Sequence, residues 1–249
     1  MLEVGFSSTP LLLMAIITIF AYLVKGVLGF GEGLITISLF LLFLDAKFVL
    51  PLALLLALIG GLYQLFHFRK NVDRATVGTM IIPLVSGVVV GTYLLNILDS
   101  EIIMLFFAVF LIVYSGKLLF FQKKDGSLQK KMKKVVAVPV GLISGIIDGL
   151  IGTGGVPIIL YLNRQEISKL VFRATCVASF VILAISRTVT YSYAGLINAE
   201  VIRITVYLIP GVVVGSFLGI KLHNVINEVL FRKIVLLALL VIGILLLIK

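Results

Sequence analysis

Long apolar segments recur along the whole chain and are separated by short polar connectors. Six of them are long enough to cross a bilayer, since a spanning helix needs about 20 residues. They cover residues 48–68, 75–98 and 102–121 in the first half and residues 170–193, 201–219 and 229–248 in the second. Their continuous apolar character differs from the alternation of a half-buried strand. The pattern therefore predicts an all-helical, polytopic membrane protein.

The beginning of each half has a different pattern. Residues 10–44 and 135–162 each contain two apolar stretches joined by a glycine-rich loop. The second region has only 28 residues, whereas two full spans would need about 40 residues and a turn. We therefore expect a re-entrant hairpin or a pair of half-helices, with the glycine loop near the middle of the membrane. Non-helical backbone is stable at that depth only inside protein or beside a water-filled cavity, so the glycine loops are candidates for a site.

Short sequences repeat at half the chain length of 249 residues. GVVVG occurs at residues 87–91 and 211–215, and GFGEG at residues 29–33 is echoed by GTGG at residues 152–155. This period predicts an internal duplication, with one structural unit repeated in each half of the chain. Within a single membrane domain of residues 1–249, repeat 1 covers residues 10–121, a basic connector covers residues 122–134 and repeat 2 covers residues 135–249. We interpret GVVVG as a helix-packing segment.

Composition agrees with a membrane protein and excludes other classes. Charged residues make up 13% of the chain, against about 25% in a soluble domain, and the mean hydropathy is +1.25. The net charge of +10 does not predict a nucleic-acid partner, because the basic residues gather in connectors, as orientation signals and lipid contacts do. With one cysteine and two isolated histidines, we expect no metal site and no cofactor.

The basic connectors also predict the orientation of the chain. Placing residues 122–134 in the cytoplasm puts 16 of the 21 lysines and arginines on that side and both termini outside. Each half then crosses the membrane an odd number of times, so repeat 2 is inserted upside down relative to repeat 1. Inverted repeats of this kind are typical of secondary transporters. A duplicated scaffold with no transport role is the alternative.

The glycine loops are predicted to bind an anion. The second arm of each hairpin should begin just after the glycines, where unpaired N–H groups and the helix dipole favour negative charge. We expect the backbone at residues 31–33 and 154–156 to bind the anion, and packing of the glycines against other helices is the alternative. The candidate substrate-binding residues are Gly29, Phe30, Gly31, Gly33, Gly152, Thr153, Gly154, Gly155, Gln64, Ser186 and Arg187.

Four charges within the apolar segments are candidates for binding or coupling, because a charge in the membrane is costly without a partner or a function. Arg187 could hold an oxyanion with two donors, could pair with a carboxylate, or could extend toward the outer surface of the membrane. Lys25 and Asp148 align at the offset of 123 residues, so a two-fold axis could bring them together as an ion pair, or each could contact backbone or water separately. Glu32 lies where the second loop has Gly155 and is expected to couple protons, to pair with Lys25 or to face outward.

The two loop segments, GVLGFGEGL at residues 26–34 and GLIGTGGVP at residues 149–157, together with the repeated GVVVG, resemble the TauE/SafE family. This family is also called the 4-toluenesulfonate uptake permeases. The resemblance covers essentially the whole chain and implies a multi-pass carrier of the prokaryotic cytoplasmic (inner) membrane that moves sulfite, sulfonates or related organic anions. Glu32 replaces the glycine common in the first loop, and Ile37 stands where a proline often occurs.

These observations predict a secondary transporter of a small sulfur-containing or organic oxyanion. It would work by alternating access, with the anion bound between the two hairpins and with the anion, the lipid bilayer and coupled protons as partners. An anion channel, or a membrane scaffold or assembly subunit, is the alternative. The sequence contains no convincing nucleophile–base pair and no cofactor motif, so we do not expect an enzyme.

Overall fold

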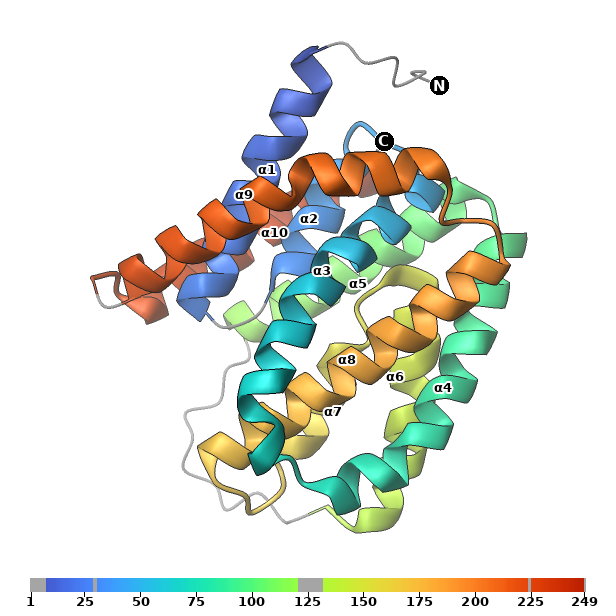
Figure 1. Cartoon of the computed structure of the whole chain (residues 1–249), viewed down its shortest axis with the longest axis vertical. Helices are drawn as coiled ribbons and strands as arrows, with labels where there is room; N and C mark the ends of the chain where they lie inside the picture. Colours follow the sequence, from blue (N-terminus) through green and yellow to red (C-terminus); the bar gives the residue numbers. More distant parts are fainter. Residues whose placement is uncertain (1–7, 29–30, 121–131, 224, 249) are drawn as a thin grey trace. The chain divides into compact units, whose positions relative to one another are not determined.

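The computed structural model describes residues 8–28, 31–120, 132–223 and 225–248, and these residues form helices without any strand (Figure 1). The helices are α1 (Ser8–Leu28), α2 (Glu32–Leu41), α3 (Ala46–Phe68), η1 (Arg69–Asn71), α4 (Arg74–Ile97), α5 (Ser100–Phe120), η2 (Lys134–Val136), α6 (Ala137–Ile151), α7 (Gly155–Leu162), α8 (Lys169–Tyr193), α9 (Ala199–His223) and α10 (Glu228–Ile248). Each of the six predicted spans forms one helix of 21 to 25 residues. The all-helical prediction is confirmed.

The two hairpins have unequal arms. The apolar stretches of the first arms cover Pro10–Leu28 and Lys134–Ile151, and both are long enough to cross a membrane. The second arms, α2 and α7, have only 10 and 8 residues. Each hairpin therefore has one arm of spanning length and one short arm, because the glycine turn comes late in each region and leaves most of its length to the first arm.

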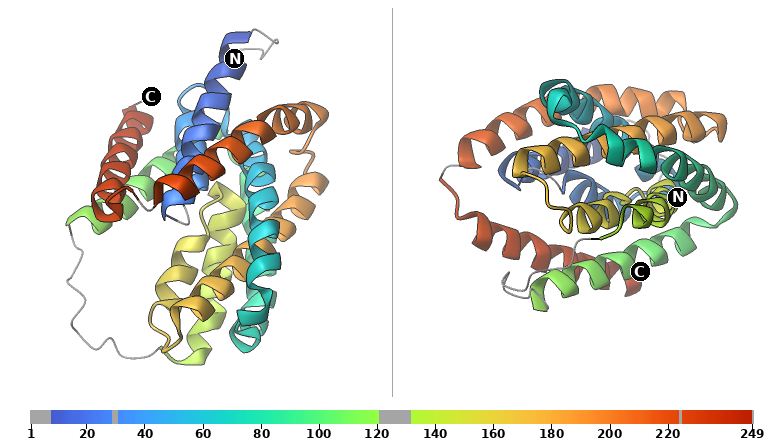
Figure 2. Two further views of the ribbon diagram at one scale, coloured as in Figure 1. Left: turned by 60° about the vertical axis from the view of Figure 1, so that its left-hand side comes forward. Right: turned by 90° about the horizontal axis from the view of Figure 1, so that it is seen from below.

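The described helices belong to two compact units, and each unit takes helices from both halves of the chain. Unit 1 consists of Met1–Leu56, Ser100–Lys124 and Ala199–Lys249, and unit 2 of Ala57–Asp99 and Asp125–Asn198. In unit 1, α1 packs on α9 and α5 lies beside α10 (Figure 2). In unit 2, α4 packs on α6 and α8, and the short α7 lies against α6 and α8 (Figure 1).

The repeated GVVVG segments pack helices together, as predicted. A Cβ atom added to Gly87 or Gly91 of α4 would lie within 2.9 Å of backbone atoms of α6. In α9 a Cβ atom on Gly215 would collide with the backbone of α1. Small residues let membrane helices approach closely and gain packing contacts. In both units, the GVVVG helix of one half therefore packs on the first hairpin arm of the other half.

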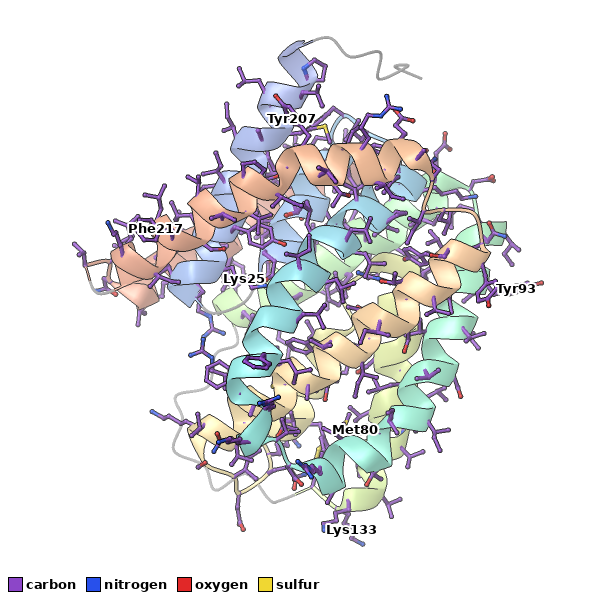
Figure 3. The ribbon with its side chains drawn as sticks, in the orientation of Figure 1. Lys25, Met80, Tyr93, Lys133, Tyr207 and Phe217 are labelled. Atoms are coloured by element: carbon purple, nitrogen blue, oxygen red, sulfur yellow. The ribbon has the colours of Figure 1, made fainter. Side chains whose placement is uncertain are left out.

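Buried apolar side chains fix the helices of unit 2 around the second hairpin. Met80, Leu84 and Val88 of α4 form a cluster with Ile158 and Tyr161 of α7, and further members come from α6 and α8. Other large apolar side chains are exposed, among them Tyr93 on α4 and Tyr207 and Phe217 on α9, which point outward from their helices (Figure 3). Such apolar outer faces fit a lipid environment.

Asp73 begins α4 and links it to α8. Its Oδ1 accepts hydrogen bonds from the backbone N–H groups of Ala75 and Thr76, at 3.1 and 3.2 Å, and its Oδ2 accepts one from the Thr76 hydroxyl at 2.6 Å. Its own N–H donates to the Thr175 hydroxyl of α8 at 3.0 Å. The hydrogen bond from the Thr76 side chain is the main cause that lowers the pKa of Asp73, because it stabilises the ionised carboxylate.

Candidate functional site

Glycines form the turn between the arms of both hairpins. In the first hairpin Gly31 has φ 101° and directly precedes α2. In the second hairpin Gly152 ends α6 with φ 74°, and Gly154 directly precedes α7. A positive φ is accessible to glycine with little strain. The second arms begin at Glu32 and Gly155, one or two residues earlier than predicted. Gly29 and Phe30 lie outside the described residues.

The second turn lies directly against the last turns of α6. A Cβ atom on Gly154 would be 2.5 Å from the Cβ atom of Asp148 and even closer to the carbonyl oxygen of Ser144. Only a residue without a side chain allows this approach. The Gly154 N–H donates to Asp148 Oδ1 at 3.2 Å. The carboxylate of Asp148 therefore faces the beginning of α7, where backbone donors and the helix dipole favour negative charge.

The first hairpin contains a partly buried ion pair between its two arms. Lys25 of α1 pairs with Glu32 at the start of α2, and the Lys25 ammonium lies 5.4 Å from the centre of the Tyr22 ring. Pairing of Glu32 with Lys25 was one of the three alternatives expected for Glu32. Within its own unit, Lys25 is paired with Glu32 and Asp148 with Arg187, and a pair between Lys25 and Asp148 stays a prediction from the repeated sequence.

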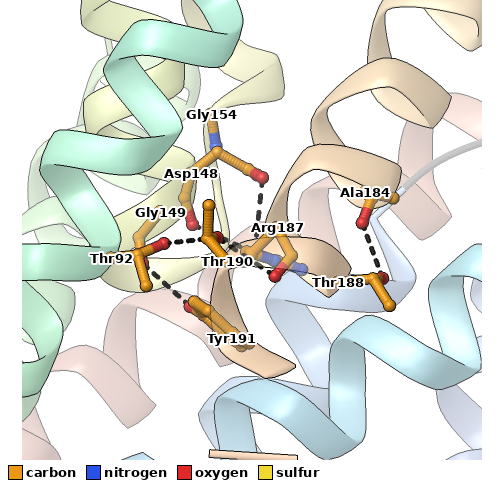
Figure 4. A network of polar contacts seen from close by, with 9 residues as sticks. All are labelled: Thr92, Asp148, Gly149, Gly154, Ala184, Arg187, Thr188, Thr190 and Tyr191. Atoms are coloured by element: carbon orange, nitrogen blue, oxygen red, sulfur yellow. Dashed lines mark hydrogen bonds and ion pairs between the residues drawn. The ribbon is translucent and has the colours of Figure 1, made fainter. Parts of the chain in front are cut away.

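Asp148 pairs with Arg187 of α8 within unit 2. Arg187 Nη1 lies 3.5 Å from Asp148 Oδ2 and donates a hydrogen bond of 3.1 Å to the Asp148 carbonyl oxygen (Figure 4). The residues are only 5% and 7% exposed, so both charges are almost fully withdrawn from solvent. The carboxylate partner that we considered for Arg187 is thus present. A buried pair of this kind is sensitive to the loss of either partner.

Hydroxyl groups extend this arrangement across α4, α6 and α8. Tyr191 donates from its hydroxyl to the Gly149 carbonyl oxygen at 2.8 Å, and the Thr92 and Thr190 hydroxyls are 2.8 Å apart (Figure 4). Sequence reasoning missed these residues. Tyr191 lies one helical turn after Arg187, on the same face of α8, so the helical spacing could have indicated it.

Several polar atoms around the second turn are buried without a hydrogen-bond partner among the described residues. They are Ser144 Oγ, Thr153 Oγ1, Asp148 Oδ2 and Arg187 Nε. Ser144 lies one turn before Asp148 on α6, and Thr153 lies within the turn itself. Buried polar groups normally have partners, so this set marks a place where a small polar ligand or water would complete the hydrogen bonding. Three of the four atoms can donate, which favours an oxyanion.

The other predicted residues contribute less to this site. Gly155 packs on the Phe180 ring, 2.8 Å from the position of an added Cβ atom. Gly33 lies in α2 with open space beside it, and Ser186 is half-buried in α8 next to Arg187. Gln64 lies in α3, but its side chain is outside the described part of the structure. Among the described residues, no group of three or more His, Cys, Asp or Glu could hold a metal ion.

The fold and site define a polytopic helical membrane protein with paired glycine-turn hairpins and buried charge pairs. Residues 14–246 match the model of the family described as "Sulfite exporter TauE/SafE". The chain belongs to this family of membrane transporters, so the family resemblance of the sequence is confirmed.

Two curated relatives are similar to the chain. The probable membrane transporter protein YtnM of Bacillus subtilis (strain 168) is 28% identical over 189 residues, which are 72% of this chain and 63% of YtnM. The chain therefore matches less than two thirds of the length of that relative. The probable sulfite/organosulfonate exporter TauE of Cupriavidus necator H16 is 25% identical over 199 residues, which are 78% of this chain and 77% of the relative. No solved structure matches the chain.

Proposed function

We propose that the chain is a secondary carrier of a small sulfur-containing or organic oxyanion of the sulfite/organosulfonate class, and that it works by alternating access. Family membership supports transport, and the name of the Cupriavidus necator relative supports the anion class. The single observation that carries the proposal is the set of buried, unpartnered polar atoms around the second glycine turn. Carrier function also fits the duplicated sequence.

The proposed binding groups lie at the start of α7 and on the facing helices. The backbone at Gly154 and Gly155, the hydroxyls of Ser144 and Thr153 and the guanidinium of Arg187 would hold the oxygens of the anion. Arginine suits this task because its planar group offers several fixed donors and stays charged. Participation of the first glycine turn, around Gly31 and Gly33, stays a prediction from the repeated sequence.

Thermal unfolding of the purified full chain with a panel of anions tests this function. Sulfite, ethanesulfonate, sulfate and acetate are added in turn, and a ligand at about 100 times its dissociation constant should stabilise the protein by about 2.7 kcal/mol. At least sulfite or ethanesulfonate should raise the melting temperature. The proposal is refuted if none of the four anions does so.

A matched pair of variants tests the site. Arg187→Lys keeps the charge that pairs with Asp148 but loses the planar set of donors, so it should fold and lose most of the stabilisation by the anion. Arg173→Lys makes the same change on an exposed residue of the same helix and should retain it. Equal stabilisation in both variants would remove Arg187 from the site. Single-channel currents in planar bilayers would instead favour the anion channel.

A further inference from the structure

Both glycine turns already hold a carboxylate of the chain itself. Glu32 lies in the first turn of α2, and Asp148 accepts the N–H of Gly154 directly before α7. Glu32 is paired with the cation of Lys25, and Asp148 is paired with the cation of Arg187. The places at which the sequence predicted a substrate anion are therefore occupied by resident anions, which the helix N-termini stabilise in the same way.

The Asp148–Arg187 pair is incompletely bonded in the second hairpin. Arg187 Nη1 interacts with Asp148, whereas Arg187 Nε and Asp148 Oδ2 have no hydrogen-bond partner among the described residues. Arg187 can donate five hydrogen bonds, so its Nε remains available as a donor to a ligand. The pair can therefore open toward a ligand without first breaking a fully satisfied network.

Charge balance limits what can enter this site. The Asp148–Arg187 pair has no net charge, so an added anion would leave one uncompensated negative charge in a buried place. An uncompensated buried charge is strongly unfavourable, and protonation of a carboxylate is the usual way to avoid it. Asp148 is the nearest group that can take up the proton, since it loses its cation when the anion binds Arg187.

We propose that Asp148 is the resident counter-ion of Arg187 and that an oxyanion displaces it together with the uptake of one proton. The ionised Asp148–Arg187 pair, the anion and one proton from solvent become a neutral Asp148 carboxylic acid and an Arg187–anion pair. This proposal rests on the proposed function and specifies its coupling. A monovalent sulfonate or hydrogensulfite leaves the site neutral, whereas a divalent anion does not, so the site should favour monovalent oxyanions.

Among the described residues of unit 2, Arg187 is the cation that pairs with Asp148. From α8, Arg187 and Tyr191 face it, and the Tyr191 hydroxyl is engaged with the Gly149 carbonyl oxygen. The remaining ionisable side chains on the described elements packed against α6 are farther away. Tyr93 of α4 points outward, Tyr161 of α7 lies in the apolar cluster, and Arg74 and Lys134 begin α4 and η2, about four to five turns from Asp148.

Calorimetric titration of the purified full chain with ethanesulfonate tests the proposal. This probe is a strong acid and stays ionised from about pH 5 to about pH 9, so any proton taken up belongs to the protein. Titrations in two buffers of different ionisation enthalpy give the number of protons taken up per anion. We expect about one proton for the unaltered protein. The dissociation constant should rise about tenfold per pH unit wherever the empty site is ionised.

Two amide variants locate the proton. Asp148→Asn should bind ethanesulfonate with no proton uptake and with a dissociation constant that does not change with pH. Glu32→Gln makes the same change in the first hairpin, and its proton count should stay at one. If proton uptake on binding is lost in Glu32→Gln and persists in Asp148→Asn, the assignment of the proton to Asp148 is overturned.

The measurements on the unaltered protein decide the question even if Asp148→Asn does not fold. Binding without proton uptake overturns the coupling but leaves the anion carrier intact. Failure of ethanesulfonate and sulfite to bind at any pH overturns the proposed function and the coupling with it. A second test compares the two anions, since the balance of charge predicts that affinity for sulfite falls more steeply at high pH, where sulfite becomes divalent.

Discussion

The two copies of GVVVG should respond differently to the same mutation, although their sequences are identical. A Cβ atom on Gly87 of α4 would lie 2.8 Å from the Ile146 nitrogen and 2.9 Å from the Gly145 Cα atom. The equivalent atom on Gly211 of α9 would lie 3.4 Å from its nearest neighbours in α1, which is ordinary van der Waals contact. Gly87→Ala therefore forces α4 and α6 apart, whereas Gly211→Ala fits the existing space.

The magnitudes follow from two opposing effects. Overpacking against backbone costs about 1–3 kcal/mol, and alanine gains about 0.5–1 kcal/mol over glycine inside a helix. Gly87→Ala should therefore lose about 1–2 kcal/mol of the free energy of unfolding. Gly211→Ala should be neutral or gain up to about 1 kcal/mol. For a chain of this size each kcal/mol corresponds to about 2–4 °C in melting temperature.

Thermal unfolding of both variants in the same detergent measures the difference. Gly78→Ala serves as a control, because it lies in α4 and has no atom within 4 Å of an added Cβ. We expect it to behave like Gly211→Ala. Equal losses in Gly87→Ala and Gly211→Ala would refute the reasoning, since the two contacts would then be equivalent despite their different geometry.

Two further predictions concern polar groups of unit 2. Asp73→Ala removes the cap of α4 and should cost about 1 kcal/mol near neutral pH. The folded-state pKa of Asp73 is lowered, so its contribution is present above the unfolded pKa of about 3.9 and is lost as pH falls through the folded value. When the pH is lowered, the melting temperature should thus fall less in Asp73→Ala than in the unaltered protein. Parallel falls of the melting temperature in the two proteins would contradict this. Tyr191→Phe removes the hydrogen bond to the Gly149 carbonyl oxygen and should cost about 1 kcal/mol. Tyr193→Phe, an exposed residue on the same helix, should leave the melting temperature unchanged, and equal effects would contradict a role for the buried hydroxyl.

The spanning helices could be predicted from the sequence because their signal is local. Twenty apolar residues in a row leave no alternative to a helix in a membrane, so each predicted segment agrees with a helix in the structure. The hairpins were harder, because length alone shows that two full spans do not fit but not how the residues divide between the arms. That division depends on where the backbone turns, at Gly31 and Gly152.

Repetition in the sequence predicted close packing but not its register. At the offset of 123 residues, Gly141 and Gly145 of α6 correspond to Thr18 and Tyr22 of α1, and only Gly149 has a glycine counterpart, Gly26. The tight contacts of α9 with α1 are accordingly shifted by one turn. Gly215 and Gly219 of α9 contact the positions of α1 that correspond to those of α6 contacted by Gly87 and Gly91. An added Cβ atom on Gly211 would make only ordinary van der Waals contacts. The identical GVVVG residues of α4 and α9 therefore lie in different environments, because the sequences of their partner helices, α6 and α1, differ.

The partner of Asp148 was also beyond the sequence, whereas Lys25 was among the partners expected for Glu32. Alignment of the repeats placed Lys25 opposite Asp148 and left Glu32 without a counterpart. In the structure the same arrangement, one carboxylate and one cation at a glycine turn, is built from different positions. The first hairpin takes its carboxylate from the second arm and its cation from the first, whereas the second hairpin takes its carboxylate from the first arm and its cation from α8. Arg187 is 39 residues from Asp148 along the chain, so no local pattern could connect them. If the Asp148–Arg187 pair opens to bind an anion and the Lys25–Glu32 pair does not, the difference follows from where the cation of each pair is placed. Lys25 and Glu32 close on each other across a single turn, whereas Arg187 approaches from a separate helix and keeps donors for a ligand.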